Sequence, residues 1–397
     1  MTIETELKLR FLVPEDTAKL STHPLLANAG VGAVEQLIAT YYDTPARELL
    51  ELGFALRVRR EGGRLLQTIK TAKAGFGGLH QRYEWEREVR EDAMLKDGPD
   101  LSQLPEILRE ETFNADLLKR LAPCFTTDFK RTQWILPLVD EGSADGRDAK
   151  GGYVEVCLDQ GEVRNGEHTA PLHEVELELK GNDDDPTRLY EIALQLQQTL
   201  PLVIENTSKA QRGYQLGACE PSASFAPVPQ KAQPVALNPE ISVQEAFISI
   251  MNNGYAQLGT DPEGVHRMQG GLRRMRTCLS LFEPLIPPDS SRALRAELSW
   301  IAHILGHARD WDVFTETLDG TDERLQSLQR EAHEKRQSCY RDLREALGSV
   351  RYSRLLLNLG AWLSGRYWLS NPDPEAWEAL ARPVGEFAAR KQDVDGE

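Results

Sequence analysis

The sequence has few cysteines and no long apolar segment. Its five cysteines are scattered and form no C-x-x-C pair, which argues against a disulfide framework or a zinc site and predicts reduced thiols. No apolar run reaches the roughly 20 residues that span a bilayer. The acidic N-terminus does not resemble a secretory signal. We therefore expect a cytoplasmic protein without a membrane partner.

An excess of positive charge is also lacking. The 46 Lys and Arg residues are outnumbered by 62 Asp and Glu residues, for a net charge of −16. This balance argues against bulk attraction to nucleic acid or to an anionic membrane. A site for a polyanion must therefore be a local concentration of Arg and Lys. The 397 residues are enough for two domains, each with its own core.

Alternating and β-rich segments dominate the chain up to about residue 217. They predict strands at 2–12, 34–43, 54–60, 64–70, 79–90, 125–138, 152–159 and 172–180. Helices are expected after Pro14, near 103–121, and from Pro186 to Leu200. About eight strands can close into a barrel, which has no exposed edge. The first 217 residues are therefore predicted to form an α+β domain with an eight-stranded antiparallel barrel and flanking helices.

The texture of the sequence changes after this region. Residues 218–240 contain five prolines and are predicted to be an extended linker. Apolar residues then recur with helical periodicity over 241–258, 263–283, 290–317, 321–347 and 350–367. Residues 241–397 are therefore predicted to form an all-α bundle of five or six helices.

Several predicted strands carry charge on one face. Glu4, Glu6 and Lys8 alternate in the first strand, and successive side chains of a strand point to opposite faces. In one strand, such a face is most simply a solvated surface. The pattern recurs in Arg57 and Arg59, in Arg82, Glu84 and Glu86, and in Glu174, Glu176 and Glu178. The recurrence favours a sheet closed around a charged interior.

Both signs of charge would occupy this interior. The acidic set is Glu4, Glu6, Glu84, Glu86, Asp159, Glu174, Glu176 and Glu178, and the basic set is Lys8, Arg57, Arg59, Lys70, Arg82, Arg131, Lys209 and Arg212. Oxygen ligands without a His or Cys cluster favour Mg²⁺ or Mn²⁺. Guanidinium groups match phosphate oxygens. The combination predicts phosphoryl chemistry in one pocket.

These residues carry a family resemblance over about residues 1–217. Glu4-x-Glu6-x-Lys8 is followed by Leu56-Arg57-Val58-Arg59, Thr68-Ile69-Lys70, Arg82-Tyr83-Glu84-Trp85-Glu86, Arg131, Glu174-Val175-Glu176-Leu177-Glu178-Leu179 and Ser208-Lys209-Ala210-Gln211-Arg212-Gly213-Tyr214. The series resembles the CYTH superfamily, the triphosphate tunnel metalloenzymes. The resemblance implies an eight-stranded antiparallel tunnel that hydrolyses or cyclises triphosphates with a divalent metal.

The resemblance also implies roles for single residues. It assigns metal binding to Glu4 and Glu6, with Glu176 and Glu178 opposite them, and catalytic roles to Glu4, Glu6, Lys8 and Lys209. The substrate-binding set is Lys8, Arg57, Arg59, Lys70, Arg82, Arg131, Lys209 and Arg212. Three points stay open at this stage. Glu174 could lie at the tunnel mouth, Arg82 and Glu86 could form a structural ion pair, and the carboxylate that orients the attacking water is not assigned.

The helical part contains one strongly basic segment, VHRMQGGLRRMRTCLSLF at 265–282. A solvated basic helix is the usual meaning of such a run, but the segment has no acidic residue to balance its arginines, which favours an anionic partner. A second segment adds His307 and Arg309, whose neighbouring carboxylates favour internal ion pairs almost equally. The two segments resemble the CHAD domain, which implies polyphosphate contacts for His266, Arg273, Arg274, Arg276 and Arg309.

The chain departs from the CHAD pattern in two ways. Gln269-Gly270 stands where the family has a further Arg and an aliphatic residue, and each of the glycines at 270 and 271 would cost roughly 1 kcal/mol in a helix interior. A second helical half with its own motif is not seen before residue 397. The sequence therefore predicts a partial CHAD-like domain.

The leading functional hypothesis is metal-dependent hydrolysis of inorganic triphosphate to pyrophosphate and phosphate. A nucleotide triphosphatase, a thiamine triphosphatase or an adenylate cyclase of the same fold is the first alternative. A non-catalytic polyphosphate-binding module is the second. The sequence leaves the oligomeric state open.

Overall fold

The computed structural model describes residues 2–71, 77–90, 98–138, 152–181, 185–217, 238–259, 264–318, 325–369 and 374–386. It divides into two compact units, Met1–Pro227 and Val228–Glu397. Most of the predicted linker, residues 218–237, lies outside the described residues. The predicted domain boundaries therefore stay a prediction.

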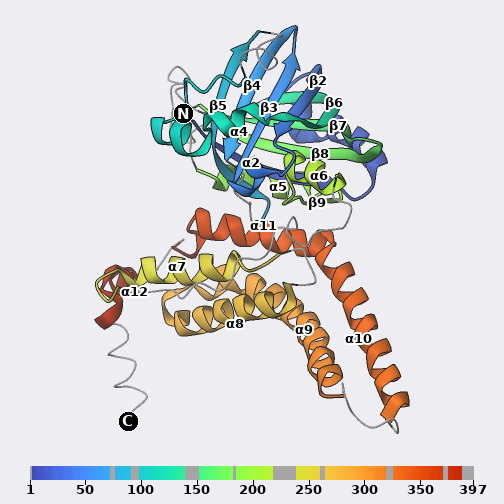
Figure 1. Ribbon diagram of the computed structural model, residues 1–397. Helices are drawn as coiled ribbons and strands as arrows, with labels where there is room; N and C mark the ends of the chain where they lie inside the picture. The colour runs from blue at the N-terminus through green and yellow to red at the C-terminus, as the bar shows by residue number, and fades with distance from the viewer. Residues whose placement is uncertain are drawn as a thin grey trace, which may run out of the picture. The chain divides into compact units, whose positions relative to one another are not determined.

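The first unit is a closed antiparallel barrel (Figure 1). Its strands are β1 (Thr2–Phe11), β2 (Ala33–Asp43), β3 (Phe54–Glu61), β4 (Arg64–Thr71), β5 (Leu79–Val89), β6 (Ala122–Pro137), β7 (Tyr153–Asn165) and β8 (His168–Lys180). Neighbouring strands follow the order β5-β4-β3-β2-β6-β7-β8-β1, and pairing of β1 with β5 closes the ring. A short strand, β9 (Leu202–Ile204), adds to β1 outside the ring. The predicted eight-stranded barrel is confirmed.

Helical segments flank the barrel. The predicted helix after Pro14 is a 3₁₀ helix (Pro14–Thr22) followed by α1 (Pro24–Ala27), and the one near 103–121 is a π-helical turn (Leu108–Thr112) followed by α4 (Ala115–Lys119). The helix predicted to start at Pro186 is α5 (Thr187–Leu196), and Asp185 accepts a hydrogen bond from its first N–H. The sequence did not predict α2 (Glu48–Glu51) or α6 (Lys209–Leu216).

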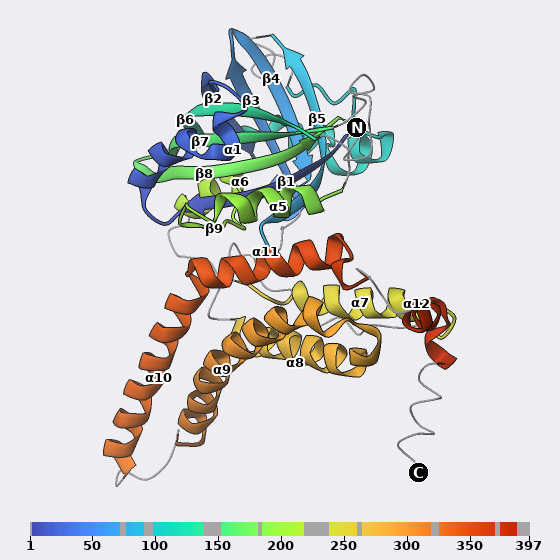
Figure 2. The same ribbon diagram turned by 180° about the vertical axis from the view of Figure 1, so that it is seen from behind.

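Each strand of the barrel separates an apolar outer face from the interior. In β1, Leu7 and Leu9 are fully buried on the outer face. The helix α5 packs against β1 and β8 (Figure 2), and contributes Leu189 and Leu196 to the buried core. Because the period of a strand is two residues, burial of this face turns Glu4, Glu6 and Lys8 inward.

The second unit is helical. Its helices are α7 (Val243–Tyr255), α8 (Val265–Leu281), α9 (Pro288–Leu318), α10 (Gln326–Leu347), α11 (Val350–Ser364) and α12 (Pro374–Ala381). These six α-helices in the described residues agree with the predicted bundle. Among the described residues, none of the helices has the length and apolarity required to cross a membrane.

Candidate active site

The barrel encloses a charged cavity of about 280 Å³. Nine carboxylate and eight cationic side chains line it, so its charge is close to neutral. Of the predicted charged residues, all line the cavity except Asp159, Glu174 and Arg212. The structure adds Glu35, Glu61, Glu155 and Lys180, which the sequence analysis did not single out.

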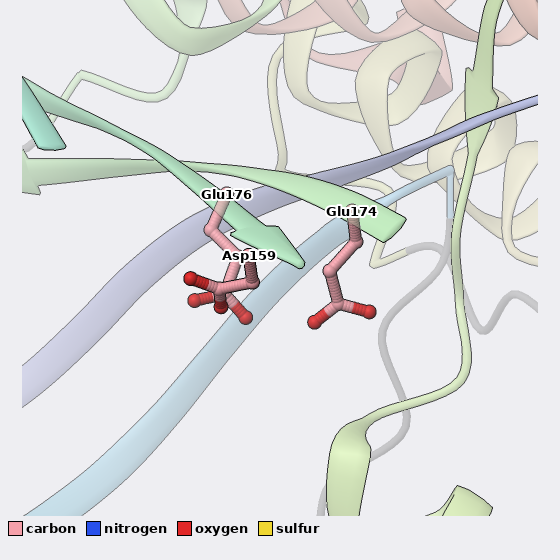
Figure 3. Close-up of side chains that lie close together, drawn as sticks. All are labelled: Asp159, Glu174 and Glu176. Carbon is pink, nitrogen blue, oxygen red and sulfur yellow. The ribbon is translucent and has the colours of Figure 1, made fainter. Parts of the chain in front are cut away.

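Three carboxylates meet on the adjacent strands β7 and β8, and one of them, Glu176, lines the cavity. Asp159 of β7 and Glu174 and Glu176 of β8 offer oxygens that all lie within 4.8 Å of one another (Figure 3). Asp159 and Glu174 stand directly opposite each other in the β7–β8 ladder, and both are fully buried. We call this group the inner cluster. Its Glu174 does not lie at a tunnel mouth.

Cations compensate the inner cluster. Arg131 binds Asp159 through two nitrogens at 2.7 and 2.6 Å and reaches Glu176 at 2.5 Å. Lys209 Nζ lies 2.7 Å from Asp159 and from Glu176 and also contacts Glu174. Lys8 contacts Glu176 as well. Burial alone would raise the pKa of Glu176, but Lys209, Lys8 and Arg131 hold that pKa well below its usual value.

A second group of ion pairs surrounds Glu4. Lys70 Nζ lies 2.6 Å from Glu4 and 3.1 Å from Glu84. Arg82 lies 3.6 Å from Glu4 and also contacts Glu6. Burial would raise the pKa of Glu4, but Lys70 and Arg82 lower that pKa to about 2. Glu4 therefore stays ionised inside the protein.

Arg82 and Glu86 have different partners from each other. Arg82 pairs with the β1 glutamates, whereas Glu86 lies 3.6 Å from Arg59 and accepts a hydrogen bond from Thr68 at 3.0 Å. The structure thus gives each residue an ion pair, but not the pair between the two that the sequence left open.

Carboxylates face one another at the level of Glu178. In the ladders, Glu178 of β8 stands directly opposite Glu6 of β1 on one side and Glu155 of β7 on the other. Like charges in such positions repel each other. Burial and the negative charge of Glu4 raise the pKa of Glu178, although Lys180 lies 2.5 Å away. Lys180 therefore does not fully offset the burial of Glu178 and its repulsion by Glu4.

Two arginines of β3, Arg57 and Arg59, are cations of the cavity whose buried N–H groups are not fully satisfied within the described part of the chain. The Nε atoms of Arg57 and Arg59 are buried and have no hydrogen-bond partner among the described residues. Arg59 pairs with Glu61 at 2.6 Å. Even so, burial and the positive charges of Arg57 and Arg131 lower the pKa of Arg59. Buried guanidinium N–H groups that lack an acceptor fit an anionic ligand.

The helix α6 is not a strand of the barrel, but it lines the cavity and places Lys209 in it. Its capping box starts the helix at Ser208, whose hydroxyl accepts from the Gln211 N–H while Gln211 accepts from the Ser208 N–H. Lys209 follows at the first helical position. Arg212, one turn on, turns away from the cavity and pairs with Glu205 at 3.1 Å and Glu174 at 3.5 Å. Arg212 therefore contacts the inner cluster from outside the lining.

Two of the missed residues had a readable signal. Glu155 lies on the same face of β7 as Asp159, because the two are four positions apart in one strand. Lys180 continues the alternation of Glu174, Glu176 and Glu178 by one step. Applying the period of two to the end of each strand would have found both.

The helical unit separates its predicted anion-binding residues. Arg273 and Arg276 are exposed and line a cavity of about 480 Å³ together with Arg295 of α9, which the sequence did not single out. Arg274 instead contacts Gln257 beside α7. His266 is exposed on α8, and Arg309 is half-buried on α9.

Comparison with known proteins identifies both parts of the chain. The family model described as the CYTH domain matches residues 2–214, and the one described as the CHAD domain matches residues 245–393. A curated inorganic triphosphatase from Haemophilus influenzae is 33% identical over 185 residues. That match covers 45% of this chain and 45% of the relative, so the chain spans about half the length of that protein.

Solved structures resemble the two parts separately. A putative adenylyl cyclase from Hippeastrum, described as having a dominant triphosphatase activity, aligns with a TM-score of 0.39 and 18% identity over 55% of this chain and 99% of its own. The CHAD domain from Ricinus communis aligns with a TM-score of 0.32 and 35% identity over 37% of this chain and 54% of its own. Since the CYTH model matches more than half of the sequence, the chain belongs to the CYTH family, with a CHAD domain at residues 245–393.

Proposed function

We propose that the protein hydrolyses inorganic triphosphate to pyrophosphate and phosphate inside the tunnel, with Mg²⁺ or Mn²⁺ as the metal. The observation that carries the proposal is the pair of buried Nε atoms on Arg57 and Arg59, which lack an acceptor among the described residues. Burying such donors is costly unless an acceptor arrives. A phosphate oxygen is the acceptor that a guanidinium fork fits best.

The charge of the lining supports an anion that enters with a metal. Because the nine carboxylates and eight cations nearly cancel, a bare polyanion would leave uncompensated negative charge in a buried site. A divalent cation beside the phosphates would offset part of that charge. The proposed substrate is therefore the metal complex of triphosphate.

The carboxylates at the level of Glu178 fit a divalent metal. Glu6 and Glu178 face each other across β1 and β8, and the pKa of Glu178 is raised by burial and by Glu4. Glu4, Glu6 and Glu178 would hold the metal. All four predicted ligands have cationic partners, but Glu176 has three of them, Lys8, Arg131 and Lys209. A bound metal would supply charge neutralisation at the phosphoryl oxygens and a water of lowered pKa.

The remaining residues act on the phosphate chain. Arg57 and Arg59 bind its oxygens, and Arg131 lines the same cavity. Lys8 and Lys209 are held as ammonium ions by the inner cluster, because burial lowers the pKa of each but the neighbouring carboxylates raise it more. Fixed cations at the transferred group stabilise the charge that develops there.

An inorganic substrate fits the lining better than a nucleotide. The aromatic side chains of the described lining are already in contact with other groups. Phe129 lies under Lys209 and Arg131, Tyr41 stacks on Phe125 with ring centroids 4.5 Å apart, and the Tyr214 hydroxyl donates to Asp43. The triphosphatase from Haemophilus influenzae, 33% identical over 185 residues, supports the same choice. We also keep the prediction of a cytoplasmic location.

A phosphate-release panel tests the proposal. Tripolyphosphate, pyrophosphate, long-chain polyphosphate, ATP and thiamine triphosphate are each incubated with the full chain and Mg²⁺ or Mn²⁺. We expect the highest kcat/KM with tripolyphosphate, and Glu6→Gln should lower it at least about 100-fold because a metal ligand is lost. A higher kcat/KM with ATP or thiamine triphosphate would favour the first alternative. Tight binding without turnover would favour the non-catalytic module.

Polyphosphate binding by the helical unit is a second proposed function. It is supported by the cavity that Arg273, Arg276 and Arg295 share between α8 and α9. We expect Arg273→Ala combined with Arg276→Ala to weaken long-chain polyphosphate binding and to flatten its salt dependence. Hydrolysis of tripolyphosphate should be unchanged, and Arg292→Ala, which removes an exposed arginine at the start of α9, is the matched control. Equal polyphosphate affinity of the unmodified protein, the double variant and the Arg292→Ala control would contradict this function.

A further inference from the structure

The position of Lys209 depends on the position of α6. Lys209 is only 6% exposed, and its Nζ atom contacts all three carboxylates of the inner cluster. The residue belongs to α6, a helix that packs on inward-facing residues of β2 and β6, whereas its partners belong to strands β7 and β8. A shift of the helix by a fraction of a turn would withdraw the ammonium group from the cluster.

A buried hydrogen bond ties α6 to the barrel. The Tyr214 hydroxyl donates to Asp43 Oδ2 at 2.8 Å, and both residues are buried. Asp43 also accepts from the backbone N–H groups of Thr44, Leu49 and Leu50 at 2.7, 2.8 and 3.1 Å. The carboxylate is thus fixed by the end of β2 and by α2. Because Tyr214 belongs to α6, its hydrogen bond to this fixed carboxylate holds α6 against the end of β2.

Close packing limits the helix further. A Cβ atom at Gly213 would lie 2.2 Å from ring carbons of Phe125 in β6, so the backbone of α6 rests directly on this ring. The rings of Phe125 and Tyr214 meet edge to face with centroids 5.0 Å apart. Asn165 at the end of β7 donates to the Gly213 carbonyl at 2.9 Å. Contacts with β2, β6 and β7 therefore fix the position of α6 on the barrel strands.

We propose that Asp43 and Tyr214 are positioning residues that seat α6 so that the Lys209 ammonium group stands at the inner cluster. The inference rests on the proposed hydrolysis of triphosphate and adds to it a residue pair that acts through Lys209. The raised pKa of Tyr214, caused by burial and by Asp43, keeps the hydroxyl protonated as the donor. The phenol oxygen itself is engaged by Asp43 and takes no part in the chemistry.

Tyr214→Phe in the full chain tests this pairing, because it deletes the hydroxyl and keeps the ring. We expect faster amide hydrogen exchange across 209–216 and a kcat for tripolyphosphate lowered about 10- to 100-fold, the range for misplacing a catalytic group by about an ångström. Tyr190→Phe on α5 is the matched control, since Tyr190 is a buried tyrosine of the same unit on a helix without a tunnel residue. It should change neither the exchange across 209–216 nor kcat.

A second variant and a double mutant separate positioning from stability. Gly213→Ala places a methyl group against Phe125 and should lower kcat as Tyr214→Phe does. In a Lys209→Met background, Tyr214→Phe should change the residual kcat by less than about 2-fold, since coupled residues are not additive. The same fold-loss of kcat in both backgrounds, or unchanged exchange across 209–216 in Tyr214→Phe, would overturn the inference.

The two levels of the proposal fail in different ways. If the unmodified protein released no phosphate from tripolyphosphate, the proposed function would fail, and the exchange measurement alone would still decide whether Tyr214 seats α6. If the unmodified protein were active and Tyr214→Phe kept full kcat, the function would stand and the positioning role would be wrong.

Discussion

Single charged residues of the tunnel differ in whether a neighbour already compensates them. Glu176 is surrounded by cations, and its pKa is low despite burial. Glu178 and Arg59 are in the opposite situation, because burial and like charges raise the pKa of the first and lower that of the second. A group that its surroundings destabilise gains most when an opposite charge arrives. We therefore expect metal binding to gain most of its free energy near Glu178, and phosphate binding to gain most of its free energy near Arg59.

A buried histidine next to the tunnel gives the protein a pH dependence. Burial and the charge of Lys8 lower the pKa of His80 to about 4. The folded state thus keeps His80 neutral, while the unfolded chain binds a proton below about pH 6.5. This contribution to stability is complete above about pH 6.5 and is lost as the pH falls toward 4. We expect the free energy of unfolding, from urea titration with EDTA, to drop by about 2 kcal/mol between about pH 7 and 5.

Two histidine variants isolate this effect. His80→Gln should remove most of that drop, although it also lowers stability at pH 7 by disturbing a buried site. His168→Gln, at an exposed position at the start of β8, should keep the drop unchanged. A drop of the same size in His80→Gln and in the unmodified protein would contradict the assignment.

At the scale of elements, Gln269 and Gly271 of α8 have packing roles, whereas a Cβ atom at Gly270 would have no neighbour closer than 3.7 Å among the described residues. A Cβ atom at Gly271 would lie 2.7 Å from the Gly254 carbonyl oxygen, and one at Gly254 would lie 2.4 Å from Met275. The helices α7 and α8 therefore approach each other through glycine backbones. Gln269 donates to the Leu305 carbonyl of α9 at 3.0 Å. At Gly271, the close approach of α7 and α8 offsets the helix-propensity cost that the sequence predicts for a glycine.

Alanine substitutions distinguish a packed glycine from a free one. Gly271→Ala should lower the free energy of unfolding by about 1–3 kcal/mol, because the methyl group meets backbone that must shift. Gly306→Ala on α9 should raise it by up to about 1 kcal/mol, since nothing lies within 4 Å of the added atom among the described residues. Thermal unfolding of the two variants followed by circular dichroism checks both signs. Stabilisation by both substitutions would show that the helices do not meet at Gly271.

The strands and their inward faces could be predicted from the sequence, whereas α6 was missed. The strands alternate over eight or more residues, so the period of two is unambiguous. The helix α6 has eight residues, too few for a clear helical period, although its capping box at Ser208 and Gln211 was a local signal. The partners of Lys209 could not be predicted, because they lie 33 to 50 positions earlier in the sequence. Closure of the barrel, not local pattern, brings them together.

For the whole molecule, net charge and local charge act in opposite directions. The chain carries −16 overall, so the proposed polyanionic substrate is repelled at long range. Attraction must come from Arg57, Arg59 and Arg131 inside the first unit, and from Arg273 and Arg276 in the second. Because each set lies within its own compact unit, we expect tripolyphosphate hydrolysis and polyphosphate binding to respond to different substitutions.

The central claim is that the tunnel hydrolyses inorganic triphosphate, with its carboxylates holding a metal and its Arg and Lys side chains binding the phosphates. Phosphorus NMR of tripolyphosphate incubated with the full chain and Mg²⁺ tests it most directly, with Lys8→Ala measured alongside. We expect pyrophosphate and phosphate in equal amounts from the unmodified protein, and at least about a 100-fold slower conversion by the variant, because a fixed cation at the transferred group is lost. Intact tripolyphosphate with either Mg²⁺ or Mn²⁺, or equal conversion by both proteins, would contradict it.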